Sequence, residues 1–123
     1  MKNENQKLIF VYNAKSGAFN AVFDAIHKAV RPGSYKCTLC KLTYSFASMN
    51  GKWRKFINNL KIAVDFLHKD EFKQNFNYKN PKFPAAFLHH NNKMKQLISP
   101  AEINRCKSIN ELMELVKDKV KAL

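Results

Sequence analysis

Two short apolar segments joined by a pair of asparagines restrict the fold of this chain more than any other feature. Residues 84–90 (PAAFLHH) and 93–99 (KMKQLIS) flank Asn91 and Asn92. Asparagine tolerates the positive φ angles of a tight hairpin turn, so this segment is predicted to be an antiparallel β-hairpin. Any fold of the chain has to include this hairpin and connect it to the elements before and after it.

Two other apolar runs are predicted to be buried strands, because β-branched and aromatic residues dominate them. They are residues 7–12 (KLIFVY) and 62–68 (IAVDFLH). Apolar residues at helical spacing predict helices between the strands, with Ser16 as an N-cap of the first helix and a capping box from Ser108 to Glu111 in the last. The helical segments are residues 17–31, about 52–60, 69–76, a turn from residue 100, and the segment after residue 108.

The predicted order of elements is β-α-β-α-β-β-α, with residues about 33–60 as a mostly helical insertion between the first helix and the second strand. This order resembles the thioredoxin-like fold, an α/β fold, and residues 1–123 are then expected to form a single domain. Pro84 precedes the third strand, where that family places a cis-proline beside its active site. The turn from Asn13 to Gly17 stands where the family carries its redox C-x-x-C, but this turn contains no cysteine.

Two motifs also look like a small bacterial family of uncharacterised proteins. They are Y-N-x-x-S-G at residues 12–17 and C-x-L-C-x-L-T at residues 37–43. This second resemblance implies no particular activity, so the chemistry has to be argued from the residues themselves.

Cys37 and Cys40 form a C-x-x-C motif inside the predicted insertion. As a redox pair they need a thiolate stabilised by a helix N-terminus or a cation, and Lys36 and Lys41 flank the motif. As a metal site they supply half of a tetrahedral thiolate set, of the kind that binds zinc. A third interpretation is that the two cysteines only pack an irregular loop, since free cysteine is among the most buried residue types.

A metal site needs further ligands, because the sequence has no second C-x-x-C. The remaining candidates are His27, His68, His89, His90 and Cys106. The two adjacent histidines of the third strand point to opposite faces, so at most one of them can take part.

The first predicted helix carries a polar stripe of Asn20, Asp24, His27 and Arg31 beside its apolar stripe. Asp24 and His27 are three residues apart and can meet on one face, where the carboxylate would orient the imidazole for metal binding or proton transfer. A cluster of His27 with Cys37 and Cys40 is therefore predicted as the metal site. The alternative is a solvated helix face with a histidine favoured by the helix dipole.

Other candidate binding residues surround these motifs. Asn13, Ser16 and Gly17 form the turn into the first helix, whose backbone N–H groups would attract an anionic ligand. The alternative role of Ser16 is that of an ordinary N-cap, since the sequence contains no phosphate-binding glycine loop. Tyr35 and Tyr44 bracket the cysteines and are expected to line the same site.

The formal net charge of +13 points to polyanions or acidic proteins as partners. Of the 22 basic residues 19 are lysines, and they are spread along the chain, whereas specific nucleic-acid readers favour arginine forks. Specific nucleic-acid recognition is therefore not expected, although the protein should adhere to nucleic acid at low salt.

Membrane insertion is not expected either, since no apolar run approaches the ~18 residues of a membrane span. The first fourteen residues resemble no signal peptide, and the odd count of three cysteines argues against a disulfide scaffold. We therefore expect a small cytoplasmic thiol-bearing protein that binds a metal or cofactor. The alternatives are a thiol-disulfide oxidoreductase using Cys37 and Cys40, and a basic polyanion-binding protein without catalysis.

Overall fold

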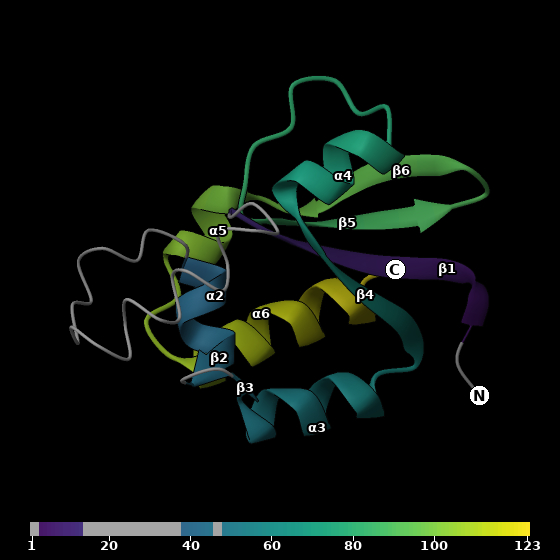
Figure 1. The fold of residues 1–123 in the computed structure, drawn as a ribbon. Helices are drawn as coiled ribbons and strands as arrows, with labels where there is room; N and C mark the ends of the chain where they lie inside the picture. Colours follow the sequence, from purple (N-terminus) through teal and green to yellow (C-terminus); the bar gives the residue numbers. More distant parts are fainter. Residues whose placement is uncertain (1–2, 14–37, 46–47) are drawn as a thin grey trace.

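The computed structural model describes residues 3–13, 38–45 and 48–123. Their fold is α/β, with a four-stranded mixed sheet that has helices on both faces (Figure 1). The strands are β1 (Asn3–Tyr12), β2 (Tyr44–Ser45), β3 (Ser48–Met49), β4 (Ile62–His68), β5 (Ala85–His90) and β6 (Lys93–Ile98). The helices are α2 (Thr38–Thr43), α3 (Gly51–Asn59), α4 (Lys69–Asn75), α5 (Pro100–Asn104) and α6 (Ile109–Lys121).

The strand order in the main sheet is β4-β1-β5-β6. β1 pairs parallel with β4, so that Tyr12 lies opposite His68. On its other side β1 pairs antiparallel with β5, with Val11 opposite Ala85. β6 returns antiparallel to β5. The carboxyl ends of β1 and β4 and the first residue of β5 therefore meet at one end of the sheet.

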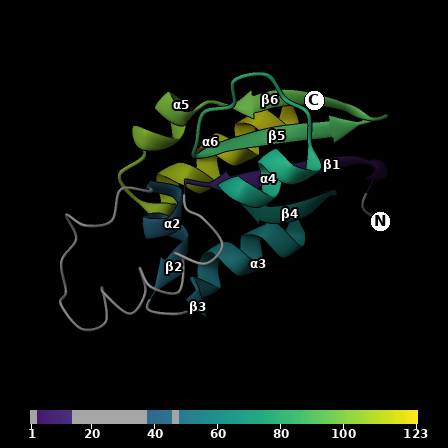
Figure 2. The ribbon, with the colours of Figure 1, turned by 45° about the horizontal axis from the view of Figure 1, so that its top comes forward.

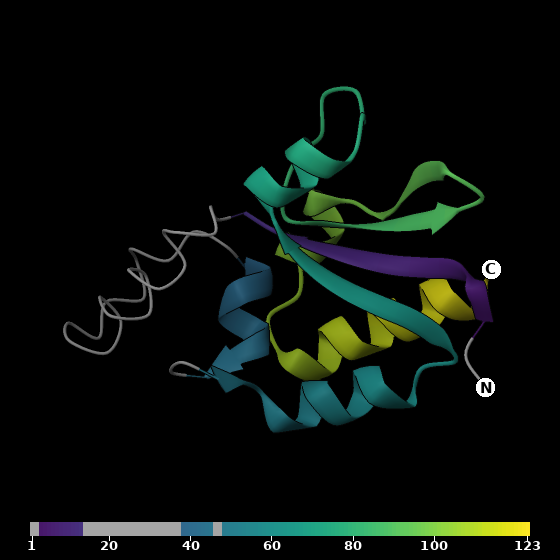
Figure 3. The same ribbon diagram turned by 45° about the vertical axis from the view of Figure 1, so that its right-hand side comes forward.

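Residues of β1 alternate between two hydrophobic clusters, because successive strand side chains point to opposite faces. Leu8, Phe10 and Tyr12 pack in a large cluster with residues of α2, α3, α5 and α6. Ile9 and Val11 pack in a smaller cluster with Phe72 of α4 and with aromatic residues of the following loop. Figure 3 shows the same division, with α4 above the sheet and α3 and α6 below it.

Local hydrogen bonds explain where the helices begin. The Asn50 side chain accepts from the backbone N–H groups of Lys52 and Trp53, at 2.9 and 3.2 Å, and so caps α3. Ser108 caps α6 by accepting from the Glu111 N–H at 3.2 Å. The Glu111 carboxylate lies 3.4 Å from the Ser108 hydroxyl, so the predicted N-cap is present, with the glutamate bonded to the cap's side chain.

Most of the predicted elements within the described residues are confirmed. The second predicted strand, residues 62–68, has the same bounds as β4, and the predicted hairpin is β5 and β6. Its turn residues Asn91 and Asn92 have φ angles of 52° and 64°, in the left-handed region that asparagine tolerates. The predicted helix at residues 17–31 lies outside the described part of the chain.

The predicted insertion is helical in α2 and α3, as expected, but it also contains the two-residue strands β2 and β3. These two strands pair with each other and form a separate small sheet. Strands this short have no measurable apolar alternation, which is why the sequence pattern could not predict them. Across residues 3–13, 38–45 and 48–123, the search for a helix of membrane-spanning length and hydropathy found no candidate.

Candidate functional site

Polar side chains gather where β1 and β4 end, at the end of the sheet from which β5 starts. Tyr12 is the last residue of β1, and His68 is the last residue of β4. Their rings lie side by side, with centroids 5.9 Å apart. Pro84 immediately precedes β5, is buried, and follows a cis Phe83–Pro84 peptide bond. Asn13 directly follows Tyr12, so two of the predicted binding residues, Asn13 and Pro84, lie at this end.

Glu71 holds His68 in a fixed orientation. Its Oε1 atom accepts a hydrogen bond from the His68 backbone N–H at 2.8 Å and lies 2.7 Å from the His68 Nδ1 atom. The backbone N–H is the main cause that lowers the pKa of Glu71, and the ring contact adds to it, so the carboxyl group stays ionised. An ionised carboxylate at Nδ1 favours the tautomer with the proton on Nδ1, and the Nε2 atom on the other side of the ring is buried.

The site has an aromatic wall on the face of the sheet that carries the large cluster. Tyr12 is only 2% exposed and stacks on Phe66 of β4, with ring centroids 6.0 Å apart. The ring of Phe10 contacts both Phe66 and Trp53, with ring centroids 5.4 Å apart in each pair. Within the described residues, the Trp53 Nε1 atom is buried without a hydrogen-bond partner. A buried N–H group without an acceptor costs about 1–3 kcal/mol of folding free energy. The indole N–H of Trp53 is therefore a hydrogen-bond donor that this wall does not use.

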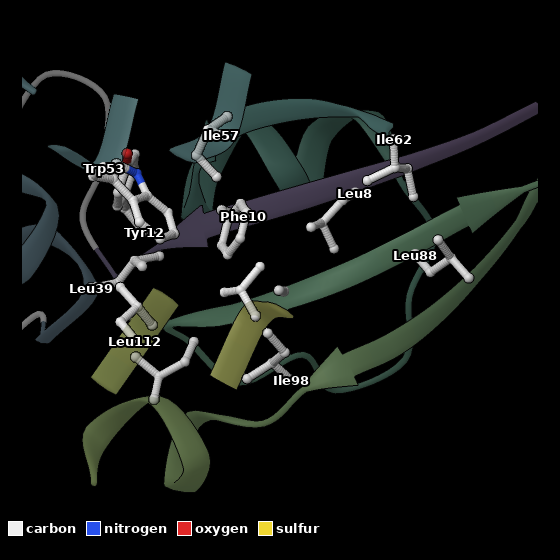
Figure 4. Packing of buried hydrophobic residues seen from close by; sticks show 13 residues of the cluster. Leu8, Phe10, Tyr12, Leu39, Trp53, Ile57, Ile62, Leu88, Ile98 and Leu112 are labelled. Atoms are coloured by element: carbon white, nitrogen blue, oxygen red, sulfur yellow. The ribbon is translucent and has the colours of Figure 1, made fainter. Parts of the chain in front are cut away.

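The C-x-x-C segment is anchored at this same end of the molecule. Leu39, which lies between the two cysteines in sequence, is 0% exposed and belongs to the cluster that contains Tyr12 and Trp53 (Figure 4). One turn later the Thr43 hydroxyl donates to the Leu39 carbonyl at 2.6 Å inside the core. Figures 1 and 2 both show α2 beside the carboxyl end of β1. The described part of the motif, Leu39 and the backbone of Cys40, therefore lies close to the end of the sheet where Tyr12 and His68 meet.

Several predicted site residues lie beyond the described part of the chain. Cys40 belongs to α2 and Tyr44 to β2 by their backbones, and only their backbones are described. The others outside the described residues are Ser16, Gly17, Asn20, Asp24, His27, Tyr35 and Cys37. The predicted contacts among these residues stay predictions.

The structure separates the other potential metal ligands that the sequence offers. His89 and His90 pair with Lys7 and Gln6 of β1, at the opposite end of the sheet from Tyr12. Within residues 3–13, 38–45 and 48–123, no three histidine, cysteine, aspartate or glutamate side chains are grouped closely enough to hold a metal ion. A metal site at the His68 end therefore needs further ligands from side chains outside the described ones.

Cys106 follows α5, packs against the large cluster, and lines an open groove of about 480 Å³ between α5 and α6. The groove is lined by Glu102, Arg105, Cys106, Asn110, Glu111, Glu114 and Leu115. Burial raises the pKa of the Cys106 thiol, and the nearby Glu111 carboxylate raises it further. A raised pKa disfavours the thiolate, so Cys106 is suited to packing and poorly suited to nucleophilic chemistry.

The sequence interpretation missed the roles of Tyr12, His68 and Glu71. The sequence alone offers His68 only as one of several possible metal ligands and does not indicate its pairing with Glu71. The spacing His-x-x-Glu across a strand-to-helix boundary was the available signal, because residues three apart share one face at the start of a helix. The contact with Tyr12 depends on the register of β1 and β4, which the sequence pattern does not reveal.

No protein-family model, no curated protein and no solved structure matches this chain.

Proposed function

We propose that this chain is a thioredoxin-like domain that binds a metal ion or cofactor through Cys37, Cys40 and an imidazole at the carboxyl end of β1. The strand order β4-β1-β5-β6, with one parallel and two antiparallel pairings, supports the fold assignment. The position of Pro84 directly before β5 supports it as well, since the resemblance implies a proline there. In this proposal the protein works in the cytoplasm, where thiols stay reduced.

The burial of Leu39 is the observation on which the proposal mainly depends. A residue between the two cysteines that is fixed in the core with Tyr12 leaves the motif little freedom to move away from β1. Cys40 follows Leu39 directly, and Cys37 precedes it by two residues. In this proposal both thiols lie near the end of the sheet at which His68 is held by Glu71.

Two imidazoles compete for the place of the third ligand. His27 is the histidine that the sequence favours, through its pairing with Asp24. His68 is the histidine that the described geometry favours, because Glu71 orients its ring in the way that carboxylates orient metal-bound histidines. Two thiolates and one or two imidazoles form a donor set typical of zinc, so zinc is the ion we would test first.

Cobalt(II) is a suitable probe, because thiolate ligation gives it intense absorption that protein without thiolate ligands lacks. We expect about one equivalent of cobalt or zinc to bind, and Cys37→Ser or Cys40→Ser to abolish the thiolate-to-cobalt absorption. Cys106→Ser is the matched control and should leave the spectrum unchanged. Absence of metal binding, together with unchanged stability of the double Cys37→Ser, Cys40→Ser variant, would refute the proposal.

Histidine variants then identify the third ligand. His27→Gln and His68→Ser are compared with His89→Ser, which changes a histidine at the far end of the sheet. The variant that lowers cobalt affinity at least tenfold marks the ligand. Equal affinity in all three variants would leave the site without an imidazole and would contradict this part of the proposal.

A second candidate function is thiol-disulfide exchange, and one observation favours it. Helix α2 begins at Thr38, directly after Cys37 in the sequence. In redox C-x-x-C motifs the first cysteine commonly precedes a helix, and its thiolate is the attacking nucleophile. This function predicts rapid alkylation of Cys37 at pH 6, with Cys106 as the slow internal standard. Alkylation of Cys37 at the rate of an ordinary thiol would eliminate it.

A further inference from the structure

The outer face of α3 is a concentrated patch of positive charge. Lys52, Arg54 and Lys55 are all exposed on this helix, and the exposed Lys61 follows it. No acidic residue occurs from residue 25 to residue 64 of the sequence, so the helix carries no negative charge of its own. We call Lys52, Arg54, Lys55 and Lys61 the α3 basic face.

Within the described part of the chain this face is not neutralised by ion pairs. The ion pairs found there use other cations: Lys7 with Asp65, His68 with Glu71, and Lys119 with Glu102. The Lys52 Nζ atom does have a partner, but it is the neutral Asn110 side chain of α6, at 2.6 Å. Among the described side chains, none of the four cations is therefore paired with a carboxylate.

Neighbouring residues extend the face and add hydrogen-bond donors. Asn58 and Asn59 are exposed on the same helix, and their amide groups can donate to phosphate oxygens. α6 runs beside α3 (Figures 1 and 3), and its exposed Lys117 lies seven residues, nearly two turns, after Asn110. Lys117 is therefore on the same stripe of α6 as the residue that contacts Lys52.

The apolar side of α3 is packed against the protein core, so it offers no exposed apolar surface for insertion into a lipid bilayer. Trp53 and Ile57 are buried, and Phe56 and Leu60 pack against the same core cluster. A helix that binds membranes at their surface has to bury an apolar face between lipids, and this helix has already buried its own in the protein. Charge and polar donors without free apolar surface fit a phosphodiester backbone better than a membrane.

We propose that the α3 basic face is an interaction surface for the phosphate backbone of nucleic acid, without base specificity. The face offers one arginine and two lysines on a helix of about 13 Å, with Lys61 just beyond its end, enough to contact a few successive phosphates. It lies on the surface of α3, so this inference does not depend on the thiol site of the proposed function.

The test compares two variants of equal net charge. The first replaces three cations of the α3 basic face with glutamine (K52Q, R54Q, K55Q). The control replaces three exposed lysines elsewhere with glutamine (K79Q, K82Q, K95Q). Each changes the formal net charge from +13 to +10, that is 13 minus 3, so only the position of the lost charge differs. Fluorescence anisotropy of a labelled DNA duplex, over a series of salt concentrations, gives the affinity of each variant.

We expect the α3 variant to bind at least tenfold more weakly at low salt and the control to keep nearly the wild-type affinity. Three lost phosphate contacts should also lower the slope of log K against log salt by about 2.7, or 0.9 for each contact. Equal weakening by the two variants would overturn the proposal, because net charge alone would then explain binding. Tight binding to anionic phospholipid vesicles without binding to the duplex would overturn it as well. The Cys37→Ser, Cys40→Ser variant should bind the duplex like the wild type, which separates this surface from the thiol site.

Discussion

Leu39→Ala tests whether the C-x-x-C segment is held against the sheet by the residue between its cysteines. Leu39 is 0% exposed and packs in the cluster of Tyr12, Trp53 and Leu112. Truncation to alanine removes three buried carbon atoms and leaves a cavity that the surrounding core can fill only in part.

The expected loss of stability follows from this burial. Buried Leu→Ala substitutions cost about 2–5 kcal/mol, and we expect about 3 kcal/mol for a site enclosed by α2, α6 and the sheet. A chain of 123 residues is typically stable by about 6–18 kcal/mol, so the variant should still fold. With a urea dependence of about 1.5 kcal/mol per molar, the unfolding midpoint should fall by about 2 M.

Trp53 is a convenient reporter for this measurement, because it is the sole tryptophan of the chain and is buried in the same cluster. Its fluorescence during urea unfolding gives the midpoint and the slope together. The matched control is Leu42→Ala, which makes the same change in the same helix at a half-buried position. We expect the control to cost about 1 kcal/mol, since it removes less apolar surface from the core.

The reasoning would be refuted if Leu39→Ala cost no more than Leu42→Ala. Such a result would mean that α2 contributes little to the core and that the C-x-x-C is not tethered by Leu39. The same variant also bears on the proposed function. If tethering positions the cysteines, Leu39→Ala should weaken cobalt binding more than Leu42→Ala does.

Three further predictions follow from local contacts. The pKa of Glu71 is below its ordinary value of 4.5 in the folded state. The ionised carboxylate therefore stabilises the fold fully above pH 4.5, and this stabilisation is lost as the pH falls through the folded pKa. Glu71→Gln should therefore flatten the acid loss of stability measured by urea unfolding, whereas Glu114→Gln, at an exposed position, should not. Cys106 should alkylate more slowly than an ordinary thiol at neutral pH, because burial raises its pKa, and unfolding in urea should remove the difference in a mass-spectrometric time course. Ser99→Ala should cost about 1 kcal/mol in thermal unfolding, since it removes the N-cap of α5, and Ser99→Thr should restore most of it.

The elements that the sequence predicted well are those with a strong local signal. The hairpin was predictable because Asn91 and Asn92 take up positive φ angles that few residues tolerate. Residues 62–68 were predictable as a strand because β-branched and aromatic residues are concentrated there. In both cases the preference of the local segment agrees with its environment in the fold.

The division of β1 between two clusters was beyond the sequence pattern. Residues 8–12 are all apolar, so no alternation shows which of them face α4 and which face α6. Only the helices on both faces of the sheet assign Phe10 to one cluster and Val11 to the other. A strand that is buried on both faces gives a continuous apolar run, which fixes its identity but not its orientation.

The candidate site depends on long-range register for the same reason. The sequence places Tyr12 and His68 at the ends of two strands that are 56 residues apart, that is 68 minus 12. Parallel pairing brings them together, and neither the Y-N-x-x-S-G motif that begins at Tyr12 nor the His-x-x-Glu spacing from His68 indicates that pairing. The position of Pro84 directly before β5 was predictable, because the resemblance to the thioredoxin-like fold implies a proline before the third strand.

The starts of α4 and α5 can be compared to ask whether His68 serves only as a helix cap or also as the metal ligand of the proposed function. At α5 the Glu102 carboxylate accepts from the Ser99 backbone N–H at 2.9 Å, and Ser99 accepts from the Glu102 N–H in return. At α4 the Glu71 carboxylate accepts from the His68 backbone N–H at 2.8 Å in the same way. Serine is a favoured N-cap and histidine is not, so capping alone would select serine at position 68. In the structure the imidazole and its contact with Glu71 are part of the cap of α4, and in the proposed function the same ring serves as a metal ligand as well. His68→Ser should accordingly keep the stability of the fold while lowering metal affinity, and a large loss of stability with unchanged metal affinity would contradict this argument.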